Sequence, residues 1–238
     1  MRRALITILL IAFAGFGALL LYGHARRHPE DMPWTALDLG RPIGTFTGRK
    51  LAGIEGGQCM ALLTRAGVRH TALPARNAGA RCGYDRAVRL APGGSLAIGY
   101  RPSDLGTSCP VAAALALLEW HVVQPAARRH FGRAVAGIDH FGSYGCRRLY
   151  GRDTGAWSEH ARANAIDIAG FTLAGGRRIS VVRGWGRGGP EAAFLREVRD
   201  GACRLFSTVL SPDYNAAHRD HLHLDQARRG GWGWRACR

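Results

Sequence analysis

The chain has 238 residues, of which 47 % are apolar, and this composition supports a folded core and excludes a disordered protein. Its formal net charge of +16 comes almost wholly from arginine, since Lys50 is the only lysine. We interpret this charge either as a composition bias or as a basic surface that suits anionic envelope polymers. The chain carries no motif of a nucleic-acid-binding domain, so we expect no nucleic-acid partner.

The N-terminus holds an uncharged, apolar run from Ala4 to Gly23, with arginines on both sides. In a helix this run spans about 30 Å, the thickness of a bilayer core. A cleavable signal peptide has a shorter apolar segment that ends in small residues, whereas this run ends in Leu21 and Tyr22. We therefore expect residues 1–23 to be a single-pass anchor in the inner membrane, with a cleaved signal segment as the alternative.

All six cysteines follow the apolar run, and none forms a CxxC pair; they are Cys59, Cys82, Cys109, Cys146, Cys203 and Cys237. An even number of dispersed cysteines indicates up to three disulfides in an oxidising compartment rather than a zinc ribbon. Proximity alone suggests Cys59 with Cys82. We expect the body of the protein in the periplasm, or secreted if the N-terminal segment is cleaved.

After the apolar run, residues 24–50 show no periodicity and are predicted to be a linker to one domain, residues 51–238. Residues 51–98 hold short apolar runs, at 61–63 and 88–90, that suggest small strands or turns.

The clearest helix is predicted from Pro110 to about His130, with Ser108 as its cap and Pro110 in its first turn. Apolar residues recur along it at helical spacing, at Val111, Leu115, Leu118 and Val122. Pro125 should kink this helix or end it early.

The second half of the chain predicts strands at 134–144, 165–173, 178–182 and 221–224, and a helix at 191–206. The strands at 165–173 and 178–182 read as a β-hairpin around a Gly-Gly turn. Together the elements predict an α+β fold, with helices packed on a small antiparallel sheet.

The candidate metal-binding and catalytic residues cluster in the second half of the chain. His221 and His223 are two apart on a strand, so both rings face one side while Leu222 enters the core. Asp167 lies between two isoleucines, where a carboxylate is costly unless a cation pairs with it, and His160 precedes it by seven residues. Two histidines and one aspartate match a catalytic zinc site with a fourth position for water, and His221 is placed as a general base.

The alternative interpretation is that these are ordinary surface or core histidines, and that Asp167 caps a turn. We also expect Asp225 to orient a neighbouring group. Trp232 and Trp234 either pack on a disulfide-stapled edge or stack on sugar rings.

The sequence also resembles a known group of zinc proteins. Residues 158–167 (SEHARANAID) resemble the SxHxxGxAxD signature of the D-alanyl-D-alanine carboxypeptidase, lysostaphin and hedgehog group, and residues 221–223 resemble its terminal HxH. His218 is similar to a histidine of the murein endopeptidases. Over residues 55–237 the chain is most similar to the bacterial extensin-like C-terminal domain family, through segments at 142–147, 194–196 and 208–215 and the closing Cys237-Arg238.

The resemblance implies a hedgehog/D-Ala-D-Ala-peptidase-like zinc fold stapled by disulfides. It implies His160, Asp167 and His223 as Zn²⁺ ligands, and His221 and Arg147 as catalytic residues, with Arg147 binding substrate or oxyanion. His218 and Ser158 would support the site or contact substrate; for Ser158 a local backbone contact is the alternative. The signature glycine is Ala163 here, which costs about 1 kcal/mol if that residue needs a positive φ.

The sequence thus predicts a zinc metallopeptidase of the cell envelope that cleaves peptide bonds of peptidoglycan, in the manner of D-Ala-D-Ala carboxypeptidases or murein endopeptidases. Its partners would be peptidoglycan or another envelope polymer, and the inner membrane through the N-terminal helix. The first alternative is a non-catalytic wall-binding module with a structural zinc. The second is a basic, anchored polymer-binding protein without metal.

Overall fold

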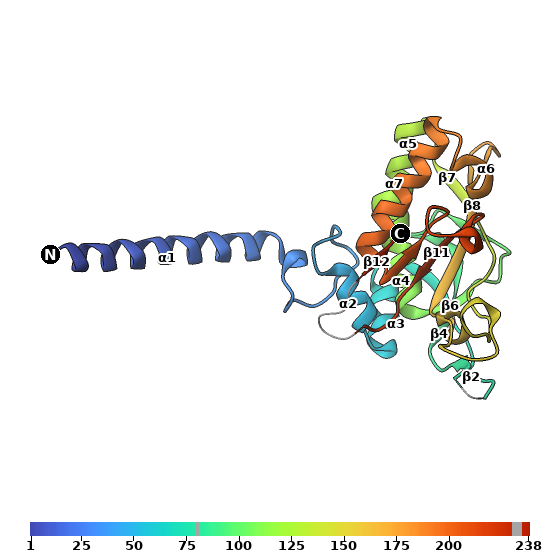
Figure 1. Cartoon of the computed structure of the whole chain (residues 1–238), viewed down its shortest axis with the longest axis horizontal. Helices are drawn as coiled ribbons and strands as arrows, with labels where there is room; N and C mark the ends of the chain where they lie inside the picture. Colours follow the sequence, from blue (N-terminus) through green and yellow to red (C-terminus); the bar gives the residue numbers. More distant parts are fainter. Residues whose placement is uncertain (80, 230–234) are drawn as a thin grey trace.

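The computed structural model describes residues 1–79, 81–229 and 235–238, so Trp232 and Trp234 lie outside the described residues. Figure 1 shows a long helix, α1 (Arg2–Arg27), that extends away from a globular body. Residues along α1 are exposed, and its mean hydropathy reaches 2.6. By length and composition α1 is suited to cross a membrane, and a signal sequence would pass the same test.

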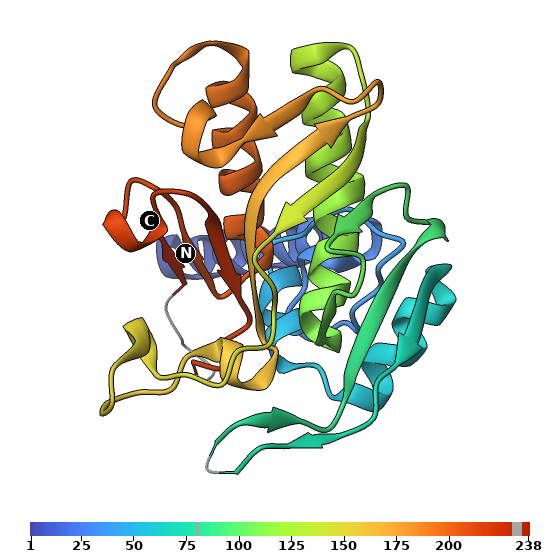
Figure 2. The same cartoon turned by 90° about the vertical axis from the view of Figure 1, so that its right-hand side faces the viewer.

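The largest sheet has seven strands in the order β12-β10-β11-β8-β7-β5, with β9 also paired to β8. Its strands are β5 (Gly99–Arg101), β7 (Val135–His140), β8 (Ala165–Leu173), β9 (Arg178–Ser180), β10 (Thr208–Leu210), β11 (Leu222–Asp225) and β12 (Ala236–Cys237). The long strand β8 pairs with β11 through its first half and with β9 through its second half (Figure 2).

The sheet is larger than the sequence predicted, and it is mixed: β5 pairs with β7, and β12 with β10, in parallel. These edge strands have two or three residues, too few to show alternation. A second sheet contains β1 (Val68–Ala72), β4 (Ala87–Gly94) and β6 (Gly106–Ser108), and β2 (Arg76–Asn77) pairs with β3 (Gly83–Tyr84). The predicted α+β class is confirmed.

Helices cover the large sheet and supply most of the core. They are α2 (Thr47–Gly53), α3 (Gly56–Arg65), α4 (Cys109–Leu118), α5 (Gln124–Phe131), α6 (Val181–Gly184) and α7 (Gly189–Leu205). Short 3₁₀ turns are η1 (Pro29–Asp31), η3 (Leu149–Gly151), η4 (Glu159–Arg162) and η5 (Ala216–His218). Every residue of α4 except Pro110 is buried, and α4 and α5 both pack against α7.

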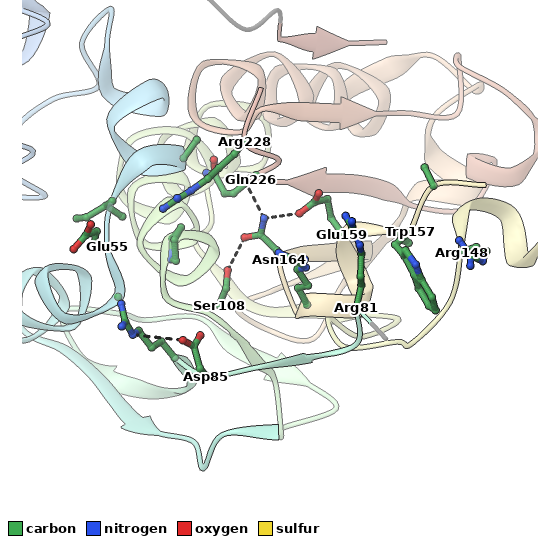
Figure 3. A pocket seen from close by; sticks show the side chains of 18 of the residues that line it. Glu55, Arg81, Asp85, Ser108, Arg148, Trp157, Glu159, Asn164, Gln226 and Arg228 are labelled. Atoms are coloured by element: carbon green, nitrogen blue, oxygen red, sulfur yellow. Dashed lines mark hydrogen bonds and ion pairs between the residues drawn. The ribbon is translucent and has the colours of Figure 1, made fainter. Parts of the chain in front are cut away.

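The predicted helix over 110–130 is present and passes through Pro125. A π-helical segment, η2 (Glu119–Val123), joins α4 to α5, and Pro125 lies in the first turn of α5. Proline clashes with the carbonyl four residues earlier and lacks an N–H, and the wider π turn interrupts that bonding pattern where it would matter. Ser108 occupies the N-cap position, but its hydroxyl donates to Asn164 Oδ1 (2.9 Å) rather than capping the helix (Figure 3).

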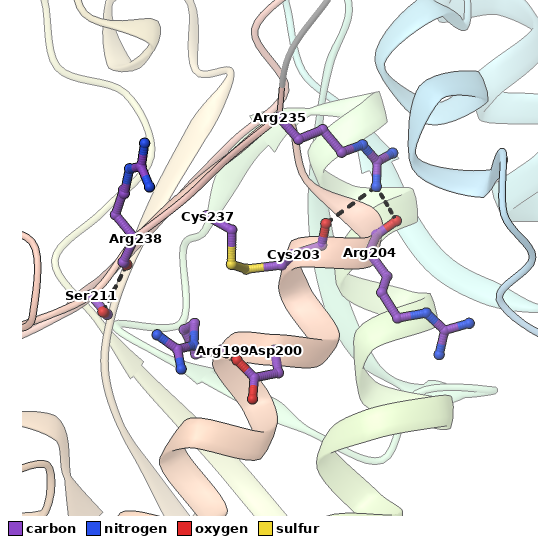
Figure 4. The surroundings of a disulfide bond; sticks show 8 residues. All are labelled: Arg199, Asp200, Cys203, Arg204, Ser211, Arg235, Cys237 and Arg238. Carbon is purple, nitrogen blue, oxygen red and sulfur yellow. Dashed lines mark hydrogen bonds and ion pairs between the residues drawn. A yellow bond between two sulfur atoms is a disulfide. The ribbon is translucent and has the colours of Figure 1, made fainter.

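The disulfides are Cys59–Cys109, Cys82–Cys146 and Cys203–Cys237, so the predicted Cys59–Cys82 pair is wrong. Cys59 lies on the buried face of α3, which packs against α4, whereas Cys82 adjoins the β2–β3 hairpin. The last disulfide ties α7 to β12, and beside it Arg235 donates to the carbonyls of Cys203 and Arg204 (Figure 4).

Three further local differences concern the region before α4 and the hairpin. Residues 61–63 belong to α3 and are not a strand, whereas 88–90 lie in β4 as predicted. The second hairpin strand ends at Ser180, where α6 begins. Leu39 and Ile43, from the segment expected to be a linker, are buried in the same core as the helices.

Candidate metal centre

Strands β8 and β11 bring a carboxylate and an imidazole face to face. In their antiparallel register Asp167 lies directly opposite His223. The residues on either side of both are fully buried: Ile166, Ile168, Leu222 and Leu224. Because side chains alternate along a strand, this packing fixes Asp167 and His223 on the opposite face of the sheet, as the sequence predicted.

The turn η4 delivers His160 to the same place. Ser158 is its N-cap, and its hydroxyl accepts the N–H of His160 (3.3 Å). The turn ends at Ala163, which has a left-handed backbone (φ 54°), at the position of the signature glycine. The carbonyl of Ala163 accepts from the N–H of Ser108 (2.8 Å) and from the hydroxyls of Thr107 and Ser143 (3.1 Å each). These bonds hold alanine in a conformation that costs about 1 kcal/mol.

Three side-chain atoms meet at the centre. His223 Nδ1 lies 2.9 Å from Asp167 Oδ1, and His160 Nε2 lies 3.2 Å from Asp167 Oδ1. The two ring nitrogens are 3.2 Å apart. His160 and Asp167 are almost completely buried, with 3 % and 6 % of their surface exposed.

The outer nitrogens of the two histidines fix which atoms face inward. His160 Nδ1–H donates to the Ser143 carbonyl (2.8 Å), and His223 Nε2–H donates to Asp225 Oδ2 (3.2 Å). Since each neutral imidazole carries one N–H, His160 Nε2 and His223 Nδ1 are left with lone pairs. Together with Asp167 Oδ1 they form three acceptors in mutual contact, an arrangement that needs a proton or a cation between them.

The donor set fits a zinc ion. Tetrahedral zinc with bonds of about 2.0–2.1 Å places its ligand atoms about 3.3 Å apart, close to the 2.9–3.2 Å separations found here. Zinc-binding histidines also donate their other N–H to a carbonyl or carboxylate, as His160 and His223 do. His160, Asp167 and His223 are therefore suited to hold the metal.

The electrostatics of the metal-free cluster match this description. Burial would raise the pKa of Asp167, but the neighbouring imidazoles of His160 and His223 hold that pKa well below its usual range. Burial would lower the pKa of His223, yet hydrogen bonds to Asp167 and Asp225 raise it to about 9. Without metal, a proton on His223 Nδ1 thus bridges to Asp167.

His221 and Arg147 lie beside the three donors. His221 Nε2 is 3.5 Å from Asp167 Oδ1, and its Nδ1–H donates to Asp220 (2.9 Å). The Phe141 ring packs edge-on against His221. The Arg147 guanidinium is 3.8 Å from Asp167 Oδ2, and half of its side chain is exposed. One basic nitrogen and one cationic fork therefore border the cluster.

His218 lies one step further out, with its ring centroid 5.2 Å from that of His221 and 6.0 Å from that of His223. Its Nδ1–H donates to Asn215 Oδ1 (2.7 Å). Burial, and then the neighbouring His221 and His223, lower the pKa of His218 to about 4, so it is neutral at pH 7. His218 therefore lies next to the three candidate metal ligands but is not one of them.

The sequence from α3 to the C-terminus assigns the chain to a protein family. The sequence profile described as "Extensin-like protein C-terminus" matches residues 57–238, more than half of the chain. The chain belongs to this family. No curated protein and no solved structure gives a match. The extensin-like region contains all six cysteines and every residue of the cluster, and α1 lies outside it.

Sequence reasoning missed several residues that shape this extensin-like site. Ser143 acts through its main-chain carbonyl, which leaves no side-chain signal, although it lies in the 142–147 segment that resembles the family. Asp220 and Asn215 orient His221 and His218 and could have been suspected from their proximity in sequence. Asp225, which we expected to orient a neighbour, contacts His223.

Proposed function

We propose that this protein is a zinc-dependent hydrolase that cleaves peptide bonds of peptidoglycan in the cell envelope. One observation carries the proposal: two imidazoles and one carboxylate turn three lone-pair atoms toward a common point, while their outer atoms are held by the Ser143 carbonyl and Asp225. His160, Asp167 and His223 would hold the ion. When bound, zinc supplies Lewis acidity, which polarises a carbonyl and makes water a nucleophile near pH 7.

We assign the role of general base and acid to His221. Because Asp220 accepts its Nδ1–H, the basic Nε2 faces the cluster at 3.5 Å from Asp167. A nitrogen in this position can take a proton from water and return it to the leaving amine. Asp220 would also stabilise the imidazolium that exists between these two events.

We assign substrate binding to Arg147. Its guanidinium is near the cluster yet half exposed, so it can reach a ligand. A planar fork of donors suits a carboxylate or a developing oxyanion. The terminal carboxylate of a D-Ala-D-Ala peptide has this chemistry, which agrees with the resemblance of residues 158–167 and 221–223 to the peptidase signatures.

Two features support an envelope location. Three disulfides staple the extensin-like region, and such bonds persist in oxidising compartments. Helix α1 would either anchor the domain to the inner membrane or direct its export. In both cases the domain would work in the periplasm or beyond it.

The test uses the full chain in non-ionic detergent. We expect one zinc per protein by elemental analysis, and release of muropeptides from purified sacculi. His160→Ala should lose both properties, whereas His70→Ala, on β1 in the other sheet, should keep both. A wild-type protein without zinc, or a His160→Ala variant that still digests sacculi, would refute the proposal.

The burial of the donors favours a second candidate, a wall-binding module with a structural zinc, since covered ions are typical of structural sites. Muropeptide release by the wild type, and its loss in His221→Ala, distinguish the two. A hydrolase would keep its zinc and lose muropeptide release. A binding module would keep its zinc, release no muropeptides even as wild type, and still sediment with sacculi.

A further inference from the structure

A concave site borders η4, the turn that also carries His160. This cavity has a volume of about 1030 Å³. Its walls come from the α2–α3 junction, the β3 region, the 148–164 segment and the chain after β11 (Figure 3). Glu159 and Arg162 of η4 line it, whereas none of the three metal donors is among its described lining residues.

The cavity carries an excess of positive charge. Five arginines and three carboxylates line it: Arg81, Arg86, Arg148, Arg162 and Arg228, and Glu55, Asp85 and Glu159. Arg86 pairs with Asp85 (3.7 Å). Within the described part of the chain, no carboxylate forms an ion pair with Arg81, Arg162 or Arg228. These exposed guanidinium groups form a site for negatively charged groups.

An aromatic ring and hydrogen-bonding groups accompany this charge. The Arg148 guanidinium lies 4.5 Å from the centroid of the Trp157 ring, which fixes the indole in the wall. Asn164 links two other lining residues: its amide donates to Glu159 Oε2 (2.6 Å) and to the Gln226 carbonyl (2.9 Å) (Figure 3).

One polar atom in this wall has no partner. Gln226 is 1 % exposed and lines the cavity, and its side-chain Oε1 receives no hydrogen bond from the described residues. A buried amide oxygen without a donor is destabilising. The Gln226 amide donates to the Leu205 carbonyl (3.0 Å), so the side chain is held inside the protein, and this oxygen is not counted among the groups that contact a ligand.

We propose that this cavity binds an acidic saccharide, with carboxylates on the arginines and a sugar ring against Trp157. The mixture of charges points to this class. Glu55 and Glu159 would repel a ligand that offers only anionic groups, but they accept hydrogen bonds from hydroxyls. A saccharide alternates carboxylates with hydroxyls and apolar ring faces, so it satisfies the arginines, the acceptors and the indole together.

The experiment measures binding of tetragalacturonate to the full chain in non-ionic detergent by isothermal titration calorimetry. We expect saturable binding that weakens with added salt. Arg162→Gln and Trp157→Ala should each weaken it about tenfold, the loss expected for one charge-assisted hydrogen bond or one aromatic contact. Arg187→Gln, an exposed arginine after α6, is the matched control and should bind as the wild type does.

Three outcomes would overturn the proposal: no saturable binding of tetragalacturonate, equal weakening in Arg187→Gln, or binding of tetraglutamate as tight as that of the saccharide, which would make the ligand an acidic peptide. Maltotetraose should bind much more weakly, because it lacks carboxylates. The His223→Ala variant should bind tetragalacturonate normally. The cavity and the metal centre can therefore fail separately.

Discussion

The Asp225→Asn substitution tests whether the contacts around the donors prepare them for metal. Asp225 Oδ2 accepts the Nε2–H of His223 at 3.2 Å, while Oδ1 accepts the N–H of Ala227 at 3.0 Å. Asparagine keeps the bond to Ala227 through its Oδ1, and so presents an NH₂ group to His223. Two donors then face each other, and the imidazole moves its proton to Nδ1.

This neutral tautomer keeps an N–H on Nδ1, where the metal-binding form of His223 presents a lone pair. Loss of an outer carboxylate typically weakens metal binding 10- to 100-fold, or about 1.4 to 2.8 kcal/mol. The metal-free protein should lose less than about 1 kcal/mol, because His223 Nδ1–H still donates to Asp167. A loss of zinc affinity without a comparable loss of stability is the expected signature.

Zinc affinity would be measured by competition with a chromophoric chelator, and stability of the metal-free chain by urea unfolding. The matched control is Asp213→Asn, which alters a carboxylate that accepts from the Trp185 indole. Zinc affinity of Asp225→Asn within twofold of wild type would refute the reasoning, as would an equal loss in Asp213→Asn.

Three other predictions concern the frame around the site. Ala163→Val should destabilise the protein by about 2 kcal/mol, because a β-branched residue is strained at φ 54°, whereas Ala163→Gly should stay within about 1 kcal/mol; thermal unfolding compares them, and equal effects would contradict the role of φ. Burial raises the pKa of Glu119 against two backbone donors, so the folded state holds this proton more tightly, and stability falls as pH rises from about 4.5 through the folded pKa. Glu119→Gln should abolish this fall in urea titrations across pH; an unchanged pH profile would show that Glu119 does not cause it. The double variant Cys82→Ser/Cys146→Ser removes a link across 64 residues and should cost about 4 kcal/mol, and unfolding under reducing conditions should erase the difference from wild type.

The strand part of the site was predictable because it depends on alternation. Asp167 sits between isoleucines and His223 between leucines, so one face had to be apolar and the other had to hold the charged groups. The outer contact of His223 is two residues along the same strand, and the same rule finds it. Much of the candidate metal centre can therefore be predicted from local periodicity.

The remaining parts depend on contacts that sequence spacing does not encode. The Ser143 carbonyl reaches His160 across 17 residues, and any residue type could offer a carbonyl there. Cys82 joins Cys146 rather than its neighbour in sequence because the fold decides which Cα atoms come within 5.4 Å. The helix passes Pro125 because a π segment precedes it, and that segment has no pattern of its own.

The short turn η4 contributes residues to both the candidate metal centre and the cavity. His160 supplies one of the three candidate metal ligands, while Glu159 and Arg162 on the same turn border the arginine-lined cavity. If a ligand on one side shifts this turn, thermodynamic reciprocity requires that each ligand change the affinity of the other by the same factor. Zinc titrations with and without tetragalacturonate would measure that factor, and a value of one would mean that the turn is rigid enough to insulate the two sites.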